Sequence, residues 1–321
     1  MALLAFHFLQ PSPMLSFLFP LVLLVLVFAP IVLIVYGLIF LRNRRASKRR
    51  SPLSHDLLRS PGESLRIEIE DMSLDLMAYL AYAPVFPLLL YSLYLTCIHF
   101  GDNPKVGVIA TTLYILMGLG ALVFSSIKIW KLAKRRNELS LGYEAEVAVA
   151  QELNLMAHDG YWIFHDFPAE KFNIDHVVVG PAGIFAVETK GRAKPINDEG
   201  KAEWNVEYDG VTLRFPGWQE TEPIQQAQRQ AKWLQEWLSK AVGEDVSVKG
   251  ILALPGWYVK RTGSGGIMAY NGKSSSTMLG RVTGSELPEK LIKQLTHQLD
   301  QRCRTVKPRA YTPDEKKREQ Q

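Results

Sequence analysis

The most informative absence in this 321-residue chain is that of charged residues from three long tracts. No Asp, Glu, Lys or Arg occurs in residues 1–41, 76–101 or 106–127. Each tract is longer than the roughly 20 apolar residues that a helix needs to cross the hydrocarbon core of a bilayer. These gaps in charge exclude an ordinary soluble protein and favour a chain that is anchored in a membrane.

We therefore assign residues 1–136 to a membrane region with three predicted transmembrane helices, at about 15–40, 76–99 and 106–128. A cleaved secretory signal is the alternative for the first tract. Such a signal begins with positive charge and has an apolar core of about 7–15 residues. This chain begins without charge and its first apolar run is longer, so an uncleaved anchor is favoured.

Basic residues are concentrated beside two of the predicted spans. Six Lys or Arg residues lie in 42–50 and four in 131–136, whereas the loop between the second and third spans has only Lys105. The positive-inside rule then places the N-terminus outside, the loop 42–75 inside, and everything after residue 130 inside. We expect an integral membrane protein of a bacterial inner membrane, with the lipid bilayer as one partner and its C-terminal domain in the cytoplasm.

Cysteine is scarce, and the positive charge is unevenly distributed. The two cysteines are Cys97, in a predicted membrane helix, and Cys303, so a disulfide between them and a cysteine-based metal site are both excluded. Residues 1–138 have 14 basic and 8 acidic groups, a net +6, whereas residues 139–321 have 23 and 24, a net −1. The C-terminal half therefore lacks the strong positive excess that many nucleic-acid-binding domains show.

Residues 137–304 have the patterns of a mixed sheet flanked by helices, an α/β fold, and we expect a charged, flexible tail at 305–321. The predicted elements, in order, are a helix at about 140–157 capped by Ser140, a strand at 161–167, a hairpin at 173–190, a second hairpin at 203–215, a helix at 222–241, a strand at 246–254, a loop at 262–280 and a helix at 286–303. In the loop 42–75, the alternation of Leu65, Ile67 and Ile69 fits either a short strand or a membrane-surface segment.

The first predicted hairpin places acidic side chains opposite one another. β-Branched and aromatic residues flank the turn Gly180-Pro181-Ala182-Gly183. If the turn is centred between Pro181 and Ala182, Asp175 faces Glu188 on the same side of the sheet, and Lys190 lies two residues further along. Like charges that face each other destabilise a hairpin, and a divalent cation is the simplest compensation. The alternative is a solvent-facing pair of carboxylates that Lys190 partly neutralises.

Four sequence blocks resemble those of the nuclease-related domain family, known as NERD, in the PD-(D/E)XK nuclease superfamily. The blocks are Gly142-Tyr-Glu-Ala-Glu146, Asn173-Ile-Asp-His176, Gly183-Ile-Phe-Ala-Val-Glu-Thr-Lys190 and Glu222-Pro-Ile-Gln-Gln226. They occur in the family's order at similar spacing and cover roughly residues 138–255. The superfamily name implies a proline before the first Asp, and here Ile174 occupies that position. The resemblance implies a restriction-endonuclease-like fold after the membrane helices.

The resemblance also implies roles for six residues. Asp175, Glu188 and the backbone carbonyl of Thr189 would be ligands of Mg²⁺, with Mn²⁺ as the alternative ion. Lys190 would orient or activate the attacking water or stabilise charge on the phosphate, and Glu146 would add a further acidic group. Gln226 would orient the site or its substrate. Glu146 also fits a solvated helix position, and Gln226 lies in a helix with several other glutamines.

The leading hypothesis is a membrane-anchored, metal-dependent nuclease that hydrolyses phosphodiester bonds of DNA or RNA on the cytoplasmic side, alone or as a homodimer. The second is a catalytically silent nucleic-acid-binding or scaffold module at the membrane. The third is a lipid- or protein-interaction protein in which the membrane spans carry the function. Intact Asp175, Glu188 and Lys190 favour the first hypothesis, and the near-neutral C-terminal half favours the other two.

Overall fold

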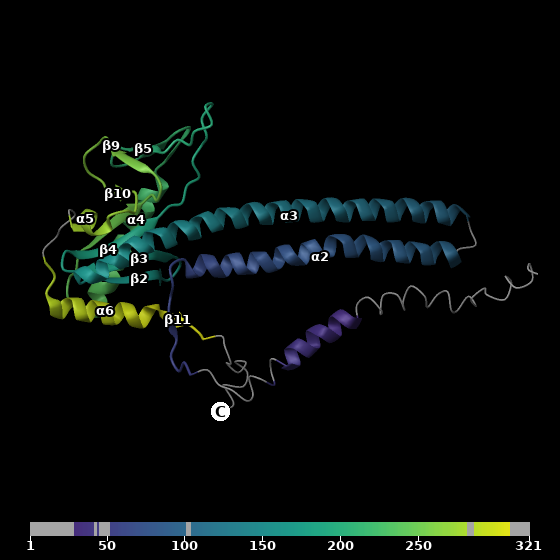
Figure 1. Cartoon of the computed structure of the whole chain (residues 1–321), viewed down its shortest axis with the longest axis horizontal. Helices are drawn as coiled ribbons and strands as arrows, with labels where there is room; N and C mark the ends of the chain where they lie inside the picture. Colours follow the sequence, from purple (N-terminus) through teal and green to yellow (C-terminus); the bar gives the residue numbers. More distant parts are fainter. Residues whose placement is uncertain (1–28, 42–43, 45–51, 101–103, 281–285, 309–321) are drawn as a thin grey trace, which may run out of the picture. The chain divides into compact units, whose positions relative to one another are not determined.

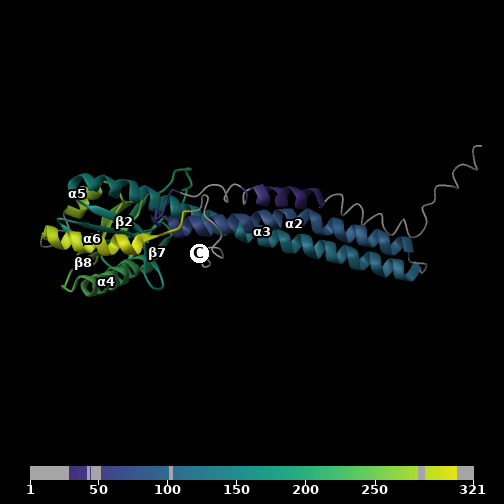
Figure 2. The same ribbon diagram turned by 90° about the horizontal axis from the view of Figure 1, so that it is seen from below.

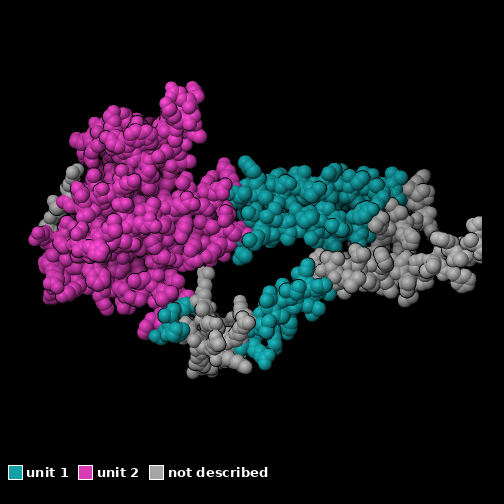
Figure 3. Space-filling view, viewed as in Figure 1, with its two compact units in different colours: residues 1–54, 74–133, 308–321 teal, residues 55–73, 134–307 magenta. Residues whose placement is uncertain are grey.

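The computed structural model describes residues 29–41, 44, 52–100, 104–280 and 286–308, drawn in colour in Figure 1. It divides the chain into two units, which Figure 3 colours separately. Unit 1 contains Met1–Ser54, Leu74–Ala133 and Pro308–Gln321, and unit 2 contains His55–Ser73 and Lys134–Lys307. Residues 55–73, which lie in the predicted cytoplasmic loop 42–75, are grouped in unit 2 with the C-terminal elements.

Unit 1 contains most of two long helices, α2 (Glu63–Phe100) and α3 (Pro104–Asn154). These helices run side by side in opposite directions (Figures 1 and 2), and the rings of Tyr94 and Tyr114 pack with centroids 5.7 Å apart. Large apolar side chains, such as Leu88 and Ile109, are exposed along both helices. By length and composition, both helices could cross a membrane. Ala29–Leu41 form a shorter apolar helix, and the rest of the predicted first span lies outside the described residues.

Both long helices extend past the predicted spans, and this overturns two local expectations. Ser140 lies inside α3 and caps no helix there. Leu65 and Ile67 lie in α2, so the alternation around them forms no strand. The reason is that Lys, Arg, Glu and Leu are all good helix formers. A helix that leaves an apolar tract can therefore continue through a polar one without a break.

The main sheet of unit 2 has five strands in the order β10-β8-β4-β3-β2. Its strands are β2 (Trp162–Pro168), β3 (Asn173–Gly180), β4 (Gly183–Thr189), β8 (Val248–Ala253) and β10 (Met268–Tyr270). β2, β3 and β4 form an antiparallel meander, and β8 and β10 continue the sheet in parallel. The expected mixed α/β architecture is confirmed. The loop predicted at 262–280 is wrong in part, because it contains β10 and α5 (Ser275–Gly280).

Helices cover both faces of this sheet (Figure 2), and each face buries its own apolar cluster. On one face, α4 (Glu222–Val242) and α6 (Glu289–Cys303) pack Leu234 and Leu295 against Val177 of β3 and Ala186 of β4. On the other face, the end of α3 and the 3₁₀ helix η2 (Leu155–Asp159) pack against the alternate residues of the same strands. α4 also makes the crossover between the parallel strands β4 and β8.

A smaller sheet and a short strand pair complete unit 2. The second sheet has the order β7-β6-β5-β9 and contains β5 (Asn205–Tyr208), β6 (Leu213–Phe215), β7 (Trp218–Glu220) and β9 (Tyr258–Arg261). The pairing of β5 with β6 confirms the second predicted hairpin. β1 (Leu57–Leu58) pairs with β11 (Arg304–Val306), which fastens the segment before α2 to the end of α6. β11 occupies the start of the predicted tail, and residues 309–321 lie outside the described part.

Candidate active site

The β3–β4 hairpin has the register that the sequence predicts. Gly180 pairs with Gly183, and the ladder continues to His176 opposite Val187. The next two facing residues are therefore Asp175 and Glu188, at the end of the hairpin away from the turn. Because β4 is flanked by β3 and β8, the end of β4 lies inside the sheet. The Glu188 side chain is accordingly only 2% exposed.

Asp175 is held by the backbone of the neighbouring strand. The Thr189 amide N–H donates to Asp175 Oδ2 at 2.6 Å, so the carboxylate lies against the end of β4. Burial raises the pKa of Asp175 well above its usual value, and the negative charges of Glu188 and Glu146 add to this effect. Asp175 therefore lies within the electrostatic reach of two other carboxyl groups, which is a costly arrangement without a cation.

Both carboxylate oxygens of Glu188 have a donor. Lys190 Nζ lies 2.6 Å from Glu188 Oε1, and Gln230 Nε2 donates to Glu188 Oε2 at 2.6 Å. The same Gln230 amide nitrogen lies 3.3 Å from the carbonyl oxygen of Asn173. Three of the residues singled out in the sequence, Asp175, Glu188 and Lys190, therefore converge at one end of two adjacent strands.

Glu146 reaches this cluster from α3 and is also buried. Burial raises the pKa of Glu146 to about 8, helped by the nearby charges of Asp166 and Glu188, whereas Lys190 and the backbone N–H of Gly62 act in the opposite direction. The close approach of α3 requires Gly191, because a Cβ there would lie 2.7 Å from the carbonyl oxygen of Leu141. Glu146 is therefore buried within electrostatic reach of Glu188 and is not a solvated helix residue, and its role in the site stays a prediction.

The other two predicted residues lie beside this cluster. Thr189 is buried at the end of β4, and its hydroxyl oxygen has no hydrogen-bond partner among the described residues. Gln226 lies on α4 one turn before Gln230 and is half-buried. Of these two glutamines it is Gln230 whose amide donates to Glu188. The assigned role of Gln226 stays a prediction, whereas Gln230 is a contact that the sequence analysis missed.

The donor set fits a hard divalent cation. In the described part of the chain, no three His, Cys, Asp or Glu side chains are grouped to hold a metal ion. Mg²⁺, however, is usually held by one or two carboxylates together with water and substrate phosphate. Asp175 and Glu188 supply two carboxylates, and the buried Gln230 Oε1 has no partner among the described residues, so it is available to a metal-bound water.

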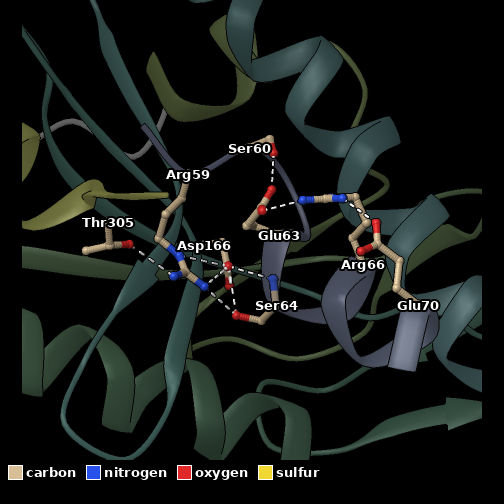
Figure 4. A network of polar contacts seen from close by, with 8 residues as sticks. All are labelled: Arg59, Ser60, Glu63, Ser64, Arg66, Glu70, Asp166 and Thr305. Atoms are coloured by element: carbon tan, nitrogen blue, oxygen red, sulfur yellow. Dashed lines mark hydrogen bonds and ion pairs between the residues drawn. The ribbon is translucent and has the colours of Figure 1, made fainter. Parts of the chain in front are cut away.

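A second group of residues beside the site was not found from the sequence. Arg59 and Ser64, from the segment that precedes and begins α2, both bind the carboxylate of Asp166 on β2 (Figure 4). Asp166 lies between the ladder pairs His165–His176 and Phe167–Ile174, so its register position is opposite Asp175. Arg59 and Asp166 are 107 positions apart in sequence, so no local pattern could have indicated this contact.

His176 lies on the opposite face of the hairpin from Asp175, as the alternation of strand side chains predicts. It is fully buried, and its Nδ1 atom lies 3.0 Å from Nδ1 of His165 on β2. Burial lowers the pKa of His165 to about 4 and that of His176 well below its usual value. The pair is therefore neutral at pH 7 and belongs to the structural core.

Comparison with known proteins supports the resemblance seen in the sequence. Residues 141–255 match the family model described as "NERD: Nuclease-related domain". The match begins on α3 five residues before Glu146 and ends two residues after β8, so it includes Asp175, Glu188, Lys190 and Gln230. Neither a curated protein nor a solved structure matches the chain. Residues 141–255 of this chain are thus similar to the nuclease-related domain family, and they are built as a mixed sheet between helices.

Proposed function

We propose that this protein is a membrane-anchored, divalent-metal-dependent nuclease that hydrolyses phosphodiester bonds of DNA or RNA. The observation that carries the proposal is the convergence of Asp175, Glu188 and Lys190 at the end of the β3–β4 hairpin, within a nuclease-related domain. Lys190 Nζ is 2.6 Å from the carboxylate of Glu188, whose side chain is 2% exposed. Two carboxyl groups with raised pKa values, the half-buried Asp175 and the buried Glu146, lie beside the same point.

Asp175 and Glu188 would hold Mg²⁺ or Mn²⁺, with the carbonyl oxygen of Thr189 as a further ligand from the protein. Such an ion supplies Lewis-acid polarisation of a phosphoryl oxygen and lowers the pKa of a bound water. The Thr189 N–H fixes the orientation of Asp175, and Gln230 fixes that of Glu188. Both carboxylates are therefore positioned before a ligand arrives, as an active site requires.

Lys190 would stabilise the negative charge that develops during the reaction, and Glu146 would accept a proton. Water attacks phosphorus, a new P–O bond forms, and one ester P–O bond breaks to leave a phosphomonoester and a free hydroxyl. The Lys190 ammonium stabilises the negative charge that develops on the phosphoryl oxygens. Glu146 in its ionised form accepts a proton from the attacking water, and a solvent proton neutralises the leaving oxygen. Gln230 Oε1, which has no partner among the described residues, would accept a hydrogen bond from that water.

The membrane part of the proposal rests on α2 and α3, which by length and composition could cross a membrane. Basic residues such as Lys131 and Lys134 follow the apolar part of α3. By the positive-inside rule they support a cytoplasmic location of the nuclease-related domain. Cytoplasmic DNA or RNA would then lie on the same side of the membrane as the active site.

The test is a nuclease assay on the full-length protein in detergent micelles. We expect Mg²⁺- or Mn²⁺-dependent cleavage of at least one substrate among single- and double-stranded DNA and RNA, and no cleavage with EDTA. Glu188→Ala and Lys190→Ala each remove a group from the centre of the site, so each should lower the rate at least 100-fold. Lys293→Ala, on the exposed face of α6, is the matched control for loss of a lysine and should cut normally.

Two results would count against the proposal. Cleavage that survives Glu188→Ala and Lys190→Ala would place the chemistry elsewhere. A wild-type protein that cleaves none of the four substrates would instead favour a catalytically silent module. A binding titration against salt would then distinguish nucleic-acid binding, which weakens steeply as salt rises, from a protein scaffold.

A further inference from the structure

We infer that Ser64, at the start of α2, is a positioning residue for the metal-binding carboxylates, so that the segment 59–66 completes the active site. This inference rests on the proposed function and adds residues that lie more than 70 positions before the nuclease-related match begins. Figure 4 shows the centre of the network, in which Arg59 and Ser64 converge on Asp166. All of the residues belong to unit 2.

Asp166 is the anion around which the network is built. Its Oδ2 atom accepts hydrogen bonds from Arg59 Nε at 3.0 Å and from the backbone N–H and the hydroxyl of Ser64, both at 2.8 Å. Arg59 Nη2 contacts the same oxygen. The Asp166 backbone has φ 46°, a left-handed conformation that costs free energy for any residue other than glycine. Such strain persists where the surroundings hold it, and it is concentrated at functional sites.

The Ser64 hydroxyl connects this ion pair to the active site. It donates to Asp166, and it accepts hydrogen bonds from Arg59 Nη2 at 2.6 Å and from Asn173 Nδ2 at 2.5 Å. These three bonds use its one proton and both of its lone pairs, so its orientation is fixed. Asn173 is two residues before Asp175 on β3, and its carbonyl oxygen contacts the Gln230 amide that donates to Glu188.

The same segment also touches the third carboxyl group of the site. The backbone N–H of Gly62 is hydrogen-bonded to Glu146 and lowers the pKa that burial has raised. Gly62 has φ 63°, and a Cβ there would lie 2.7 Å from the ring of Tyr143, so only glycine fits. The segment thus contacts Glu146 directly and Glu188 through Asn173 and Gln230.

The competing interpretation is a clamp that only fastens the start of α2 to β2. A clamp would need the Arg59–Asp166 pair but not the Ser64–Asn173 hydrogen bond. Groups that hydrogen-bond to metal ligands without touching the metal orient those ligands. Their removal typically lowers metal affinity or activity about 10- to 100-fold. The Ser64–Asn173 bond therefore distinguishes the two interpretations.

The experiment measures Mn²⁺ affinity and cleavage by the full-length protein in detergent. The Mn²⁺ concentration that half-saturates thermal stabilisation should rise about 10- to 100-fold in Ser64→Ala and in Asn173→Ala. The double variant should be no weaker than Asn173→Ala alone, because Ser64 acts through Asn173. Thr305→Ala is the control: it removes the other hydroxyl that Arg59 contacts, at 3.2 Å, and should leave the midpoint unchanged.

Several results would overturn the inference. One is an effect of Ser64→Ala no larger than that of Thr305→Ala, and another is strict additivity in the double variant. If Ser64→Ala does not fold, Asn173→Ala decides, since it leaves the Arg59–Asp166 pair intact; a midpoint within twofold of wild type would refute the positioning role. A wild-type protein that binds Mn²⁺ without cutting refutes the proposed function alone. A wild-type protein that does not bind Mn²⁺ refutes both.

Discussion

Replacing Glu146 by glutamine should stabilise the metal-free protein, and the gain should depend on pH. The pKa of Glu146 is raised from 4.5 to about 8 in the folded state, mainly by burial. Its proton is therefore bound more tightly in the folded than in the unfolded chain. The associated stability is complete below pH 4.5 and is lost as the pH rises towards 8. At pH 7 the difference corresponds to about 3 kcal/mol, since one pKa unit is worth about 1.4 kcal/mol.

Glu146→Gln removes this titration while keeping the size of the side chain. The gain in unfolding free energy should approach about 3 kcal/mol at pH 7 and fall below about 1 kcal/mol at pH 5. In a domain of this size, about 3 kcal/mol raises the melting temperature by roughly 6–12 °C. Tryptophan fluorescence is a suitable probe, because six of the seven tryptophans lie in unit 2. The measurements are made in EDTA, at pH 5, 6, 7 and 8.

Activity should change in the opposite direction from stability. The same variant loses the carboxylate that would accept the proton of the attacking water, so its cleavage rate should fall at least 10-fold, within the range typical of general acid–base groups. Saturating Mg²⁺ should also stabilise the wild type more than the variant, because the ion compensates charge that the variant lacks. A gain in stability that is the same at pH 5 and pH 8 would show that Glu146 is solvated, and the electrostatic argument for the site would fail.

Three further predictions follow from individual contacts. Gln230→Ala should lower the cleavage rate more than Gln226→Ala, because Gln230 donates to Glu188; a larger effect of Gln226→Ala in the same assay would reverse this assignment. A fragment of residues 137–321 should melt at a lower temperature than the full-length protein and bind Mn²⁺ more weakly, because it lacks Gly62 and Ser64; equal Mn²⁺ midpoints would contradict this. His165 contributes with the opposite sign to Glu146: its contribution to stability should be lost as the pH falls from about 6.5 to 4, because the unfolded chain binds a proton that the folded-state imidazole does not. His165→Asn should therefore raise the melting temperature relative to wild type more at pH 4.5 than at pH 7, and an equal shift at both pH values would contradict this.

The elements that the sequence predicts well are those specified by neighbouring residues. The turn Gly180-Pro181-Ala182-Gly183, flanked by β-branched residues, fixes the register of the hairpin, and the register places Asp175 opposite Glu188. The helix α4 begins at Glu222, close to Pro223, which fits only the first turn of a helix. In both cases the signal is local, so one sequence is sufficient.

The contacts that the sequence does not predict join distant segments. Arg59 and Asp166 are 107 positions apart, and Ser64 and Asn173 are 109 apart. A signal for Gln230 was present, because it lies three residues after Ala227 and four before Leu234, on the buried stripe of α4. Because the helix contains several other glutamines, the sequence alone did not distinguish Gln230 from them. The ends of helices were misplaced because good helix formers continue across the boundary between apolar and polar tracts.

The charge of the site bears on the choice between an enzyme and a silent binding module. Asp175, Glu188 and Glu146 lie within electrostatic reach of one another, and Lys190 already contacts Glu188. A phosphodiester brings further negative charge, so its approach to this point is unfavourable unless a cation is added. A module that only binds nucleic acid has no need of such an acidic centre and would do better with basic residues in its place. Retention of carboxyl groups whose pKa values are raised is costly for folding, and the proposed metal-dependent hydrolysis would account for this cost.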